Sequence, residues 1–141
     1  MRRSALLTIV FAGGMAALTG GCRGVEKTES FTISNPLVVT PERPLADVPV
    51  PTGFAFKSYG SYIFDGNYRV ARLLYRGTPH VEEVIHYFKE QMPQSRWMFV
   101  RDSGVDGRVL TFHNDSEELE LTLDRQSGMT ALQIDIKPRR V

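Results

Sequence analysis

Alternating apolar and polar residues predict β-strands over the last part of the chain. In residues 118–124 and 130–137 every second residue is leucine or isoleucine, with polar residues between most of them. A period of two with one polar face indicates strands that are packed on one side and wetted on the other. Two further strands are expected before them, at 97–101 and 108–113. The turn-forming pair Asp106-Gly107 lies between these two. In the last two strands, 118–124 and 130–137, the apolar positions are Leu119, Leu121, Leu123, Leu132, Ile134 and Ile136.

A single helix is predicted between residues 78 and 92. Thr78 is a good N-cap, Pro79 is favoured at the first helical position, and Pro93 ends the pattern. The apolar residues of this stretch follow the spacing of one buried helix face. They are Val81, Val84, Ile85, Phe88 and Met92.

A β-hairpin is predicted before the helix. Residues 62–64 and 67–76 form its strands, and Asp65-Gly66 between them suits a type I′ turn. Gly77 ends the second strand. The element order is then β-β-α-β-β-β-β. This order predicts an α+β fold, with a mostly antiparallel sheet of about five or six strands and one helix packed on one face.

The first 22 residues carry the pattern of an export signal. Arg2 and Arg3 are followed by an uncharged, mostly apolar run over residues 5–18. This run is shorter than the roughly 20 residues that cross a bilayer, and it fits the apolar region of a signal peptide. The small residues Gly20-Gly21 directly precede Cys22, which is the only cysteine of the chain.

Residues 1–22 resemble the lipobox signal of bacterial lipoproteins, with Thr19 in the place usually held by leucine. The resemblance implies that residues 1–21 are removed and that Cys22 receives diacylglycerol and an acyl chain such as palmitate. The protein is then expected in the bacterial cell envelope, facing the periplasm and held at the membrane by lipid. Arg23, where aspartate would retain a lipoprotein at the inner membrane, favours the outer membrane. The alternative is an ordinary secretory signal with a chance cysteine.

Proline marks the segment after the cysteine as a tether. Five of the eight prolines lie in residues 23–52, and extended backbone of this length reaches up to roughly 90 Å at about 3.1 Å per residue. The apolar run 37–39 within the segment is expected to pack on the domain as an edge strand, with a partner contact as the alternative. The predicted organisation is a signal peptide at 1–21, the lipidated cysteine and tether at 22–52, and one α+β domain at 53–137.

A second pattern covers most of that domain. It consists of the strand at 69–75, the aromatic pair Tyr87-Phe88 ahead of Met92-Pro93, and Trp97, which follows Arg96 where glycine is expected. In these features residues 48–137 resemble a small uncharacterised α+β domain of bacterial envelope lipoproteins. The motif is one of packing. The resemblance therefore implies a fold and a compartment, and it implies no catalytic residue.

Charge and motif content set aside several classes of function. With 17 basic and 16 acidic residues the chain has a net charge of +1, which gives no basic surface for nucleic acid. His86 has Glu82 and Glu90 four residues away on either side, which favours a solvated charged face over a metal site with three ligands. The sequence contains no G-x-S-x-G, G-x-G-x-x-G or Walker motif. It predicts no enzyme, no metal and no cofactor other than the covalent lipid.

The strand at 68–76 is apolar on both faces. One face carries Ala71, Leu73 and Tyr75. Aromatic residues beside arginine, as on the other face, are typical of interface anchors. Either the segment around Phe54 and Phe56 folds over that face, which is favoured because most apolar surface is buried internally, or a partner covers it. The candidate partner surface consists of Tyr68, Val70, Arg72, Leu74 and Arg76.

These observations predict a lipid-anchored envelope lipoprotein whose domain is a non-enzymatic module for protein interaction or structure. Its expected partners are the membrane, through the lipid, and another envelope protein. The alternative is a periplasmic carrier that binds a small ligand between the helix and the sheet. The bulky residues Ile85 and Phe88 make a roomy cleft there less favoured. A hydrolytic enzyme is the least favoured, because titratable groups do not cluster at motif spacing.

Overall fold

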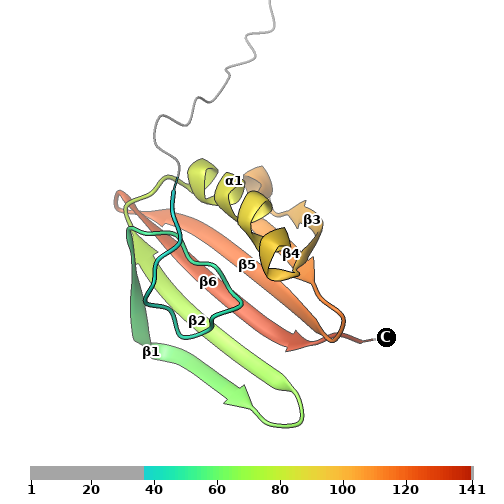
Figure 1. Cartoon of the computed structure of the whole chain (residues 1–141). Helices are drawn as coiled ribbons and strands as arrows, with labels where there is room; N and C mark the ends of the chain where they lie inside the picture. The colour runs from blue at the N-terminus through green and yellow to red at the C-terminus, as the bar shows by residue number, and fades with distance from the viewer. Residues whose placement is uncertain (1–36, 141) are drawn as a thin grey trace, which may run out of the picture. The chain divides into compact units, whose positions relative to one another are not determined.

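The computed structural model describes residues 37–140, which form a six-stranded antiparallel sheet with a helix packed against it (Figure 1). The strands lie in the order β1-β2-β6-β5-β4-β3, and the predicted α+β fold with its β-β-α-β-β-β-β order is confirmed. The elements are β1 (Phe54–Asp65), β2 (Arg69–Gly77), α1 (Val81–Gln91), β3 (Met98–Ser103), β4 (Val109–His113), β5 (Glu117–Gln126) and β6 (Met129–Pro138), with 3₁₀ turns at Met92–Ser95 and Val105–Gly107.

The apolar positions of β5 and β6 form the centre of the core, as their alternation predicted. The leucines of β5 pair with buried residues of β6, for example Leu121 with Ile134, so their side chains share the inner face of the sheet. α1 lies across this face (Figure 1), and Val84 and Phe88 have no solvent-exposed area. Tyr87 is buried as well, whereas Ile85 is only half-buried.

The helix begins later than the sequence predicted. His80 is its N-cap, and the Glu83 carboxylate accepts a hydrogen bond from the His80 N–H at 3.2 Å. The carbonyl of Pro79 accepts from the Thr130 hydroxyl at 2.6 Å, which holds this residue to β6. Thr78 and Pro79 therefore belong to the connection between β2 and α1, and the predicted helix start at these residues is wrong.

The first hairpin also differs from its prediction. β1 begins at Phe54, and three residues connect it to β2, because Asp65 pairs with Arg69. Gly66 is not among the glycines with positive φ, so the connection is not the predicted type I′ turn. A two-residue turn of that type needs positive φ at both central positions, and the longer connection does not.

Residues 37–52, called the strap from here on, pack against the inner face beside the helix (Figure 1). Val48 and Val50 are completely buried, and Leu37, Val39 and Leu45 pack half-buried against the same core. Within the strap Val39 pairs with Pro51, and Thr40 N–H donates to the Val50 carbonyl at 2.8 Å.

The strap corrects two predictions. The packed domain includes at least residues 37–52, so the tether does not extend to residue 52. The run 37–39 pairs within the strap and not at an edge of the sheet. The strap packs there because one eleven-residue helix covers only part of the inner face of six strands, and the remaining apolar area of that face needs another cover. The strap covers the part that β1 and β2 contribute.

None of the helices in residues 37–140 has the length and apolarity needed to cross a membrane.

Candidate interaction surface

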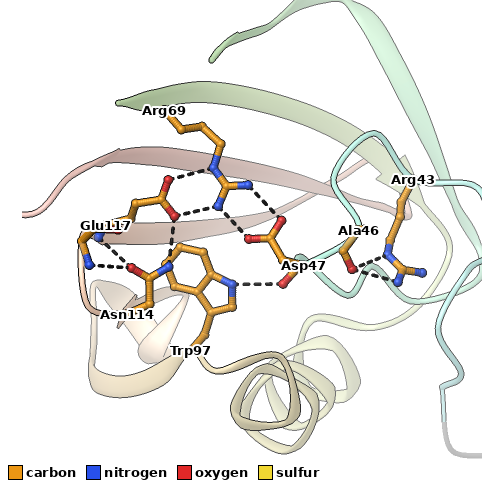
Figure 2. Close-up of polar contacts among 8 residues, drawn as sticks. Arg43, Ala46, Asp47, Arg69, Trp97, Asn114 and Glu117 are labelled. Carbon is orange, nitrogen blue, oxygen red and sulfur yellow. Dashed lines mark hydrogen bonds and ion pairs between the residues drawn. The ribbon is translucent and has the colours of Figure 1, made fainter. Parts of the chain in front are cut away.

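An ion-pair cluster centred on Arg69 fixes the strap to the sheet (Figure 2). The guanidinium of Arg69 donates to both carboxylate oxygens of Asp47, at 2.9 and 2.7 Å, and to both of Glu117, at 2.9 and 2.7 Å. The Asn114 amide donates to Glu117 at 3.0 Å, and the indole N–H of Trp97 donates to the Asp47 carbonyl at 3.0 Å. The cluster thus joins the strap to β2, to β5 and to Trp97, the residue directly before β3.

Hydrogen bonds from one cation, Arg69, stabilise the two carboxylates of this cluster. The hydrogen bond from Arg69 is the main reason that the pKa of Asp47 is lowered, and burial opposes it. The same hydrogen bond is the main cause that raises the pKa of Arg69. Since Arg69 holds both carboxylates in bidentate pairs, neither is placed to act as a free acid or base. The cluster is a structural clamp.

A bulge in β1 decides which side chains face outward. Lys57 pairs with Leu74 and Tyr62 with Arg72, so β1 advances five residues while β2 advances two. The Ser61 hydroxyl stabilises the bulge, because it accepts a hydrogen bond from the Leu74 N–H at 2.9 Å and donates to the Lys57 carbonyl. Three extra residues are an odd number, and side chains alternate between faces along a strand. Even-numbered residues of β1 therefore face inward before the bulge and outward after it.

The change of parity separates the aromatic residues of β1. Phe56 lies on the inner face, where its ring centroid is 5.4 Å from that of Tyr75. Tyr62 and Phe64 pair with Arg72 and Val70, and so they lie on the outer face. Phe54 pairs with Gly77 on the inner side. The favoured prediction, that the segment around Phe54 and Phe56 folds over the outer face, is therefore wrong.

The structure brings the five residues of the predicted partner surface together. Val70, Arg72, Leu74 and Arg76 alternate along the outer face of β2, and Tyr68 lies just before that strand, with its ring centroid 6.5 Å from that of Phe64. Phe64 is 59% exposed and Tyr68 58%. Together with the two aromatic residues of β1 they form the outer patch, which consists of Tyr62, Phe64, Tyr68, Val70, Arg72, Leu74 and Arg76.

Positive charge prevails on this part of the sheet. Arg72 donates to Asp135 of β6 at 2.7 Å, which raises the pKa of Arg72 and fixes its guanidinium. Arg76 and Lys57 form no ion pair with any residue in the described range. The outer positions of β1 and β2 carry no carboxylate among the described residues, since Asp65 pairs with Arg69 on the inner side. The outer patch is thus aromatic and basic.

An open groove borders the outer patch. Leu74 and Ala131 contribute apolar surface to it, and the charged residues that line it are Lys57, Arg76 and Asp124, with Tyr59 beside them. Tyr59 stands in the bulge of β1 and is 95% exposed. The groove is open to solvent along its length, so it suits side chains of a macromolecule better than an enclosed small ligand.

Sequence reasoning missed Tyr62 and Phe64 as members of the outer patch, and Tyr59 as part of the groove beside it. Gly60 lies between Tyr59 and Ser61 in the middle of an aromatic strand, and a glycine inside a strand often marks a bulge. That signal indicates the bulge. It does not give the number of extra residues, and only this number determines which aromatic residues face outward.

The histidines occupy separate positions. His86 Nε2 lies 3.1 Å from the Glu90 carboxylate on the exposed side of α1, which is the predicted i, i+4 pair. His80 caps the helix, and His113 on β4 contacts Arg139 at 3.3 Å. Within residues 37–140 no three side chains of His, Cys, Asp or Glu lie close enough together to hold a metal ion.

Cys22 and the predicted export signal lie outside the described residues, as does the predicted tether up to residue 36. The chain matches no known protein-family model, and it matches no curated protein.

Proposed function

We propose that the protein is a lipid-anchored lipoprotein of the bacterial cell envelope whose domain binds another envelope protein through the outer patch. One observation carries the interaction part of the proposal. Tyr62, Phe64 and Tyr68 are each at least half exposed, and they share one face of a rigid sheet with Arg72 and Arg76. Most proteins bury or disperse such residues, and a contiguous exposed group is typical of an interaction site.

The ion pair between Arg72 and Asp135 supports this reading. Asp135 also accepts from the Gln133 amide at 2.5 Å, so the arginine is held from a neighbouring strand. A guanidinium that is already ordered loses less conformational entropy when a partner binds. The outer patch therefore presents a preorganised arginine beside aromatic rings, which is the composition of binding hot spots.

The anchor part of the proposal rests on the sequence around Cys22. Diacylglycerol and further acyl chains on this cysteine supply stable attachment, since each buried CH₂ adds about 0.8 kcal/mol. The strap shortens the reach, because only residues 23–36 lie between Cys22 and the packed part of the chain. Their contour length does not exceed about 50 Å. The partner is therefore expected near the surface of the membrane that holds the lipid, and Arg23 favours the outer membrane.

The alternative of a small-ligand carrier has less support. It needs space between the helix and the sheet, where the side chains of Val84, Phe88 and Met92 have no exposed area and fill the core. The groove beside the outer patch is open and borders an exposed surface. Both features favour a macromolecular partner.

The interaction is tested by crosslinking intact cells, purifying the tagged full-length protein and identifying bound proteins by mass spectrometry. We expect one stoichiometric envelope partner, which is lost in the double variant Arg72→Glu, Arg76→Glu. Arg101→Glu is the matched control, because Arg101 lies on the same outer face at the opposite edge strand and should keep the partner. If the partner remains bound to the double variant, the outer patch is not the interface.

The anchor is tested separately by growth with labelled palmitate. The full-length protein should carry the label and sediment with membranes, and Cys22→Ser should lose both properties. An unlabelled wild-type protein would show that the cysteine is not acylated. The interaction test does not depend on this result.

A further inference from the structure

We propose that the partner is captured as an extended segment that adds to β1 as a seventh strand, and that this segment is apolar with flanking acidic residues. The inference rests on the proposed function and specifies the chemistry of its partner. It is carried by the position of β1 at the edge of the sheet, by the exposure of that edge, and by the charge around it.

β1 is the terminal strand of the sheet and pairs only with β2 among the described residues. From Tyr62 to Asp65 it runs in regular antiparallel register, with one side bonded to β2. The main-chain groups of its other side are thus available to an added strand. An unprotected edge of this kind is a template for strand addition, in which main-chain hydrogen bonds supply affinity.

This stretch is apolar on both faces, which an ordinary edge strand avoids. Tyr62 and Phe64 lie outward, while Ile63 points to the inner side and is 42% exposed. Beside Ile63 the structure has a hollow lined also by Pro44, Phe56 and Leu73. A strand laid along this edge would place alternate side chains in the hollow and against the outer rings. Apolar residues are expected at both kinds of position.

The two edges of the sheet differ in where their bulges and charges lie, since β3 is only six residues long and its bulge interrupts the exposed apolar stretch 98–100. β3 has a bulge between Phe99 and Arg101, and its Asp102 carboxylate accepts from Lys89 of α1 at 2.7 Å. Bulges and charges are the usual devices that keep edges from pairing. In β1 the bulge lies before Tyr62, and the three residues Tyr62, Ile63 and Phe64 hold no charge.

Charge complementarity identifies the occupant. Lys57 and Arg76 lie on the outer face of β1 and β2 and form no ion pair with any described residue. Asp124 of β5 lines the same groove, but its carboxylate already accepts a hydrogen bond from Gln126 at 2.6 Å and lies 3.8 Å from Arg108. Arg76 lies opposite the small residue Ala55 of β1, so its side chain can extend toward the edge. A second copy of β1 would bring another lysine and no outward carboxylate. A partner segment with acidic residues beside its apolar stretch satisfies both cations.

The test places a photo-crosslinking phenylalanine analogue at Phe64 of the full-length protein in the cells that make it. The crosslinked peptide is then sequenced. We expect a segment of another protein with alternating apolar residues flanked by aspartate or glutamate. Ile63→Lys places a charge on the inner side of the edge and should lower the yield of crosslink by about tenfold or more. Lys57→Glu should lower it as well, and Arg101→Glu should leave it unchanged.

Amide hydrogen exchange gives a second readout that does not need the variants to fold. In the purified complex, exchange at Tyr62–Asp65 should slow by about tenfold or more relative to the protein alone. Unchanged exchange there would overturn the proposal. So would a crosslink from Phe64 to a second copy of the chain, or to lipid.

The outcomes separate this inference from the proposed function. If Arg72→Glu abolishes partner binding while Ile63→Lys and Lys57→Glu have no effect, the outer patch is the interface and strand addition is wrong. If no protein is crosslinked and none copurifies, both proposals fail.

Discussion

The indole nitrogen of Trp97 donates a hydrogen bond to the main-chain carbonyl of Asp47, fifty positions earlier in the chain, at 3.0 Å. The same Asp47 binds Arg69 of β2 through its side chain (Figure 2). Asp47 thus binds two parts of the domain. Its main-chain carbonyl accepts from the completely buried Trp97, and its carboxylate pairs with the sheet. The strap is therefore a structural part of the domain.

Truncation of a buried strap residue should destabilise the whole domain. Val48→Ala removes two methyl groups from a completely buried position and should lower the free energy of unfolding by about 2 kcal/mol. Val38→Ala is the matched control, because Val38 is 61% exposed and its truncation should change stability by less than about 0.5 kcal/mol. Urea unfolding followed by circular dichroism measures both. Equal stabilities would mean that the strap does not contribute to the cooperative unit.

Removal of the Arg69 guanidinium should lower the stability of the domain. Arg69→Met keeps most of the side-chain volume and leaves the Asp47 and Glu117 carboxylates without their cation. Glu117 is only 14% exposed, so we expect a loss of about 2–4 kcal/mol in the free energy of unfolding. Arg72→Met breaks a solvent-exposed ion pair on the same strand and should change stability little. A similar effect of the two substitutions would contradict the role of Arg69 as a clamp.

Acid should weaken the strap through Asp47. Hydrogen bonding to Arg69 lowers the pKa of this carboxyl from 3.8, so the folded state binds its proton less tightly than the unfolded chain does. The contribution to stability is therefore present above pH 3.8 and is lost as the pH falls through the lowered pKa. In urea titrations at decreasing pH, the wild type and Asp47→Asn should differ near neutrality and converge in acid. A constant difference across the range would be the contrary result.

Alkali should destabilise the core through Tyr75. Burial raises the pKa of this phenol from 10.0 to about 12, because the charged phenolate is disfavoured there. The folded state then holds the proton more tightly than the unfolded chain does. Stability is full below pH 10.0 and declines as the pH rises toward about 12. Tyr75→Phe should reduce that decline in urea unfolding measured against pH, and Tyr59→Phe, at a 95% exposed position, is the control. An unaltered decline in Tyr75→Phe would assign it to other groups.

Near neutral pH the same substitution should raise the free energy of unfolding slightly. The Tyr75 hydroxyl is buried and has no hydrogen-bond partner among the described residues, and this is also true of Tyr87. Removing an unsatisfied hydroxyl relieves part of its desolvation cost.

Local pattern was sufficient for the strands β5 and β6 and for most of the helix face, where Tyr87 is buried in place of the predicted Ile85. Their buried residues, such as Leu121, Ile134 and Phe88, lie where periods of two and 3.6 residues place them, because those periods follow from backbone geometry alone. The start of the helix was misplaced because a hydrogen bond from Thr130, about fifty residues away, holds the Pro79 carbonyl to the sheet. No residue near Pro79 in the sequence signals that contact.

The candidate surface was predictable in part for the same reason. The side chains of Val70, Arg72, Leu74 and Arg76 share a face because they alternate along one strand. The contribution of β1 depends on a bulge whose size is set by the pairing of Lys57 and Tyr62 with β2. A change of one residue in that pairing would exchange the inner and outer aromatic residues.

The sequence by itself determined the element order, the buried positions of β5 and β6 and most of those of α1, and the five residues of β2 and its turn that form the predicted surface. These depend on the periodicity of single elements, which neighbouring residues fix. Only the tertiary structure decided that the strap completes the core, that Arg69 joins Asp47 to Glu117, and that Tyr62 and Phe64 turn outward. Each of these depends on which distant segments pack or pair together, and therefore on burial and register that arise only when the whole sheet has formed.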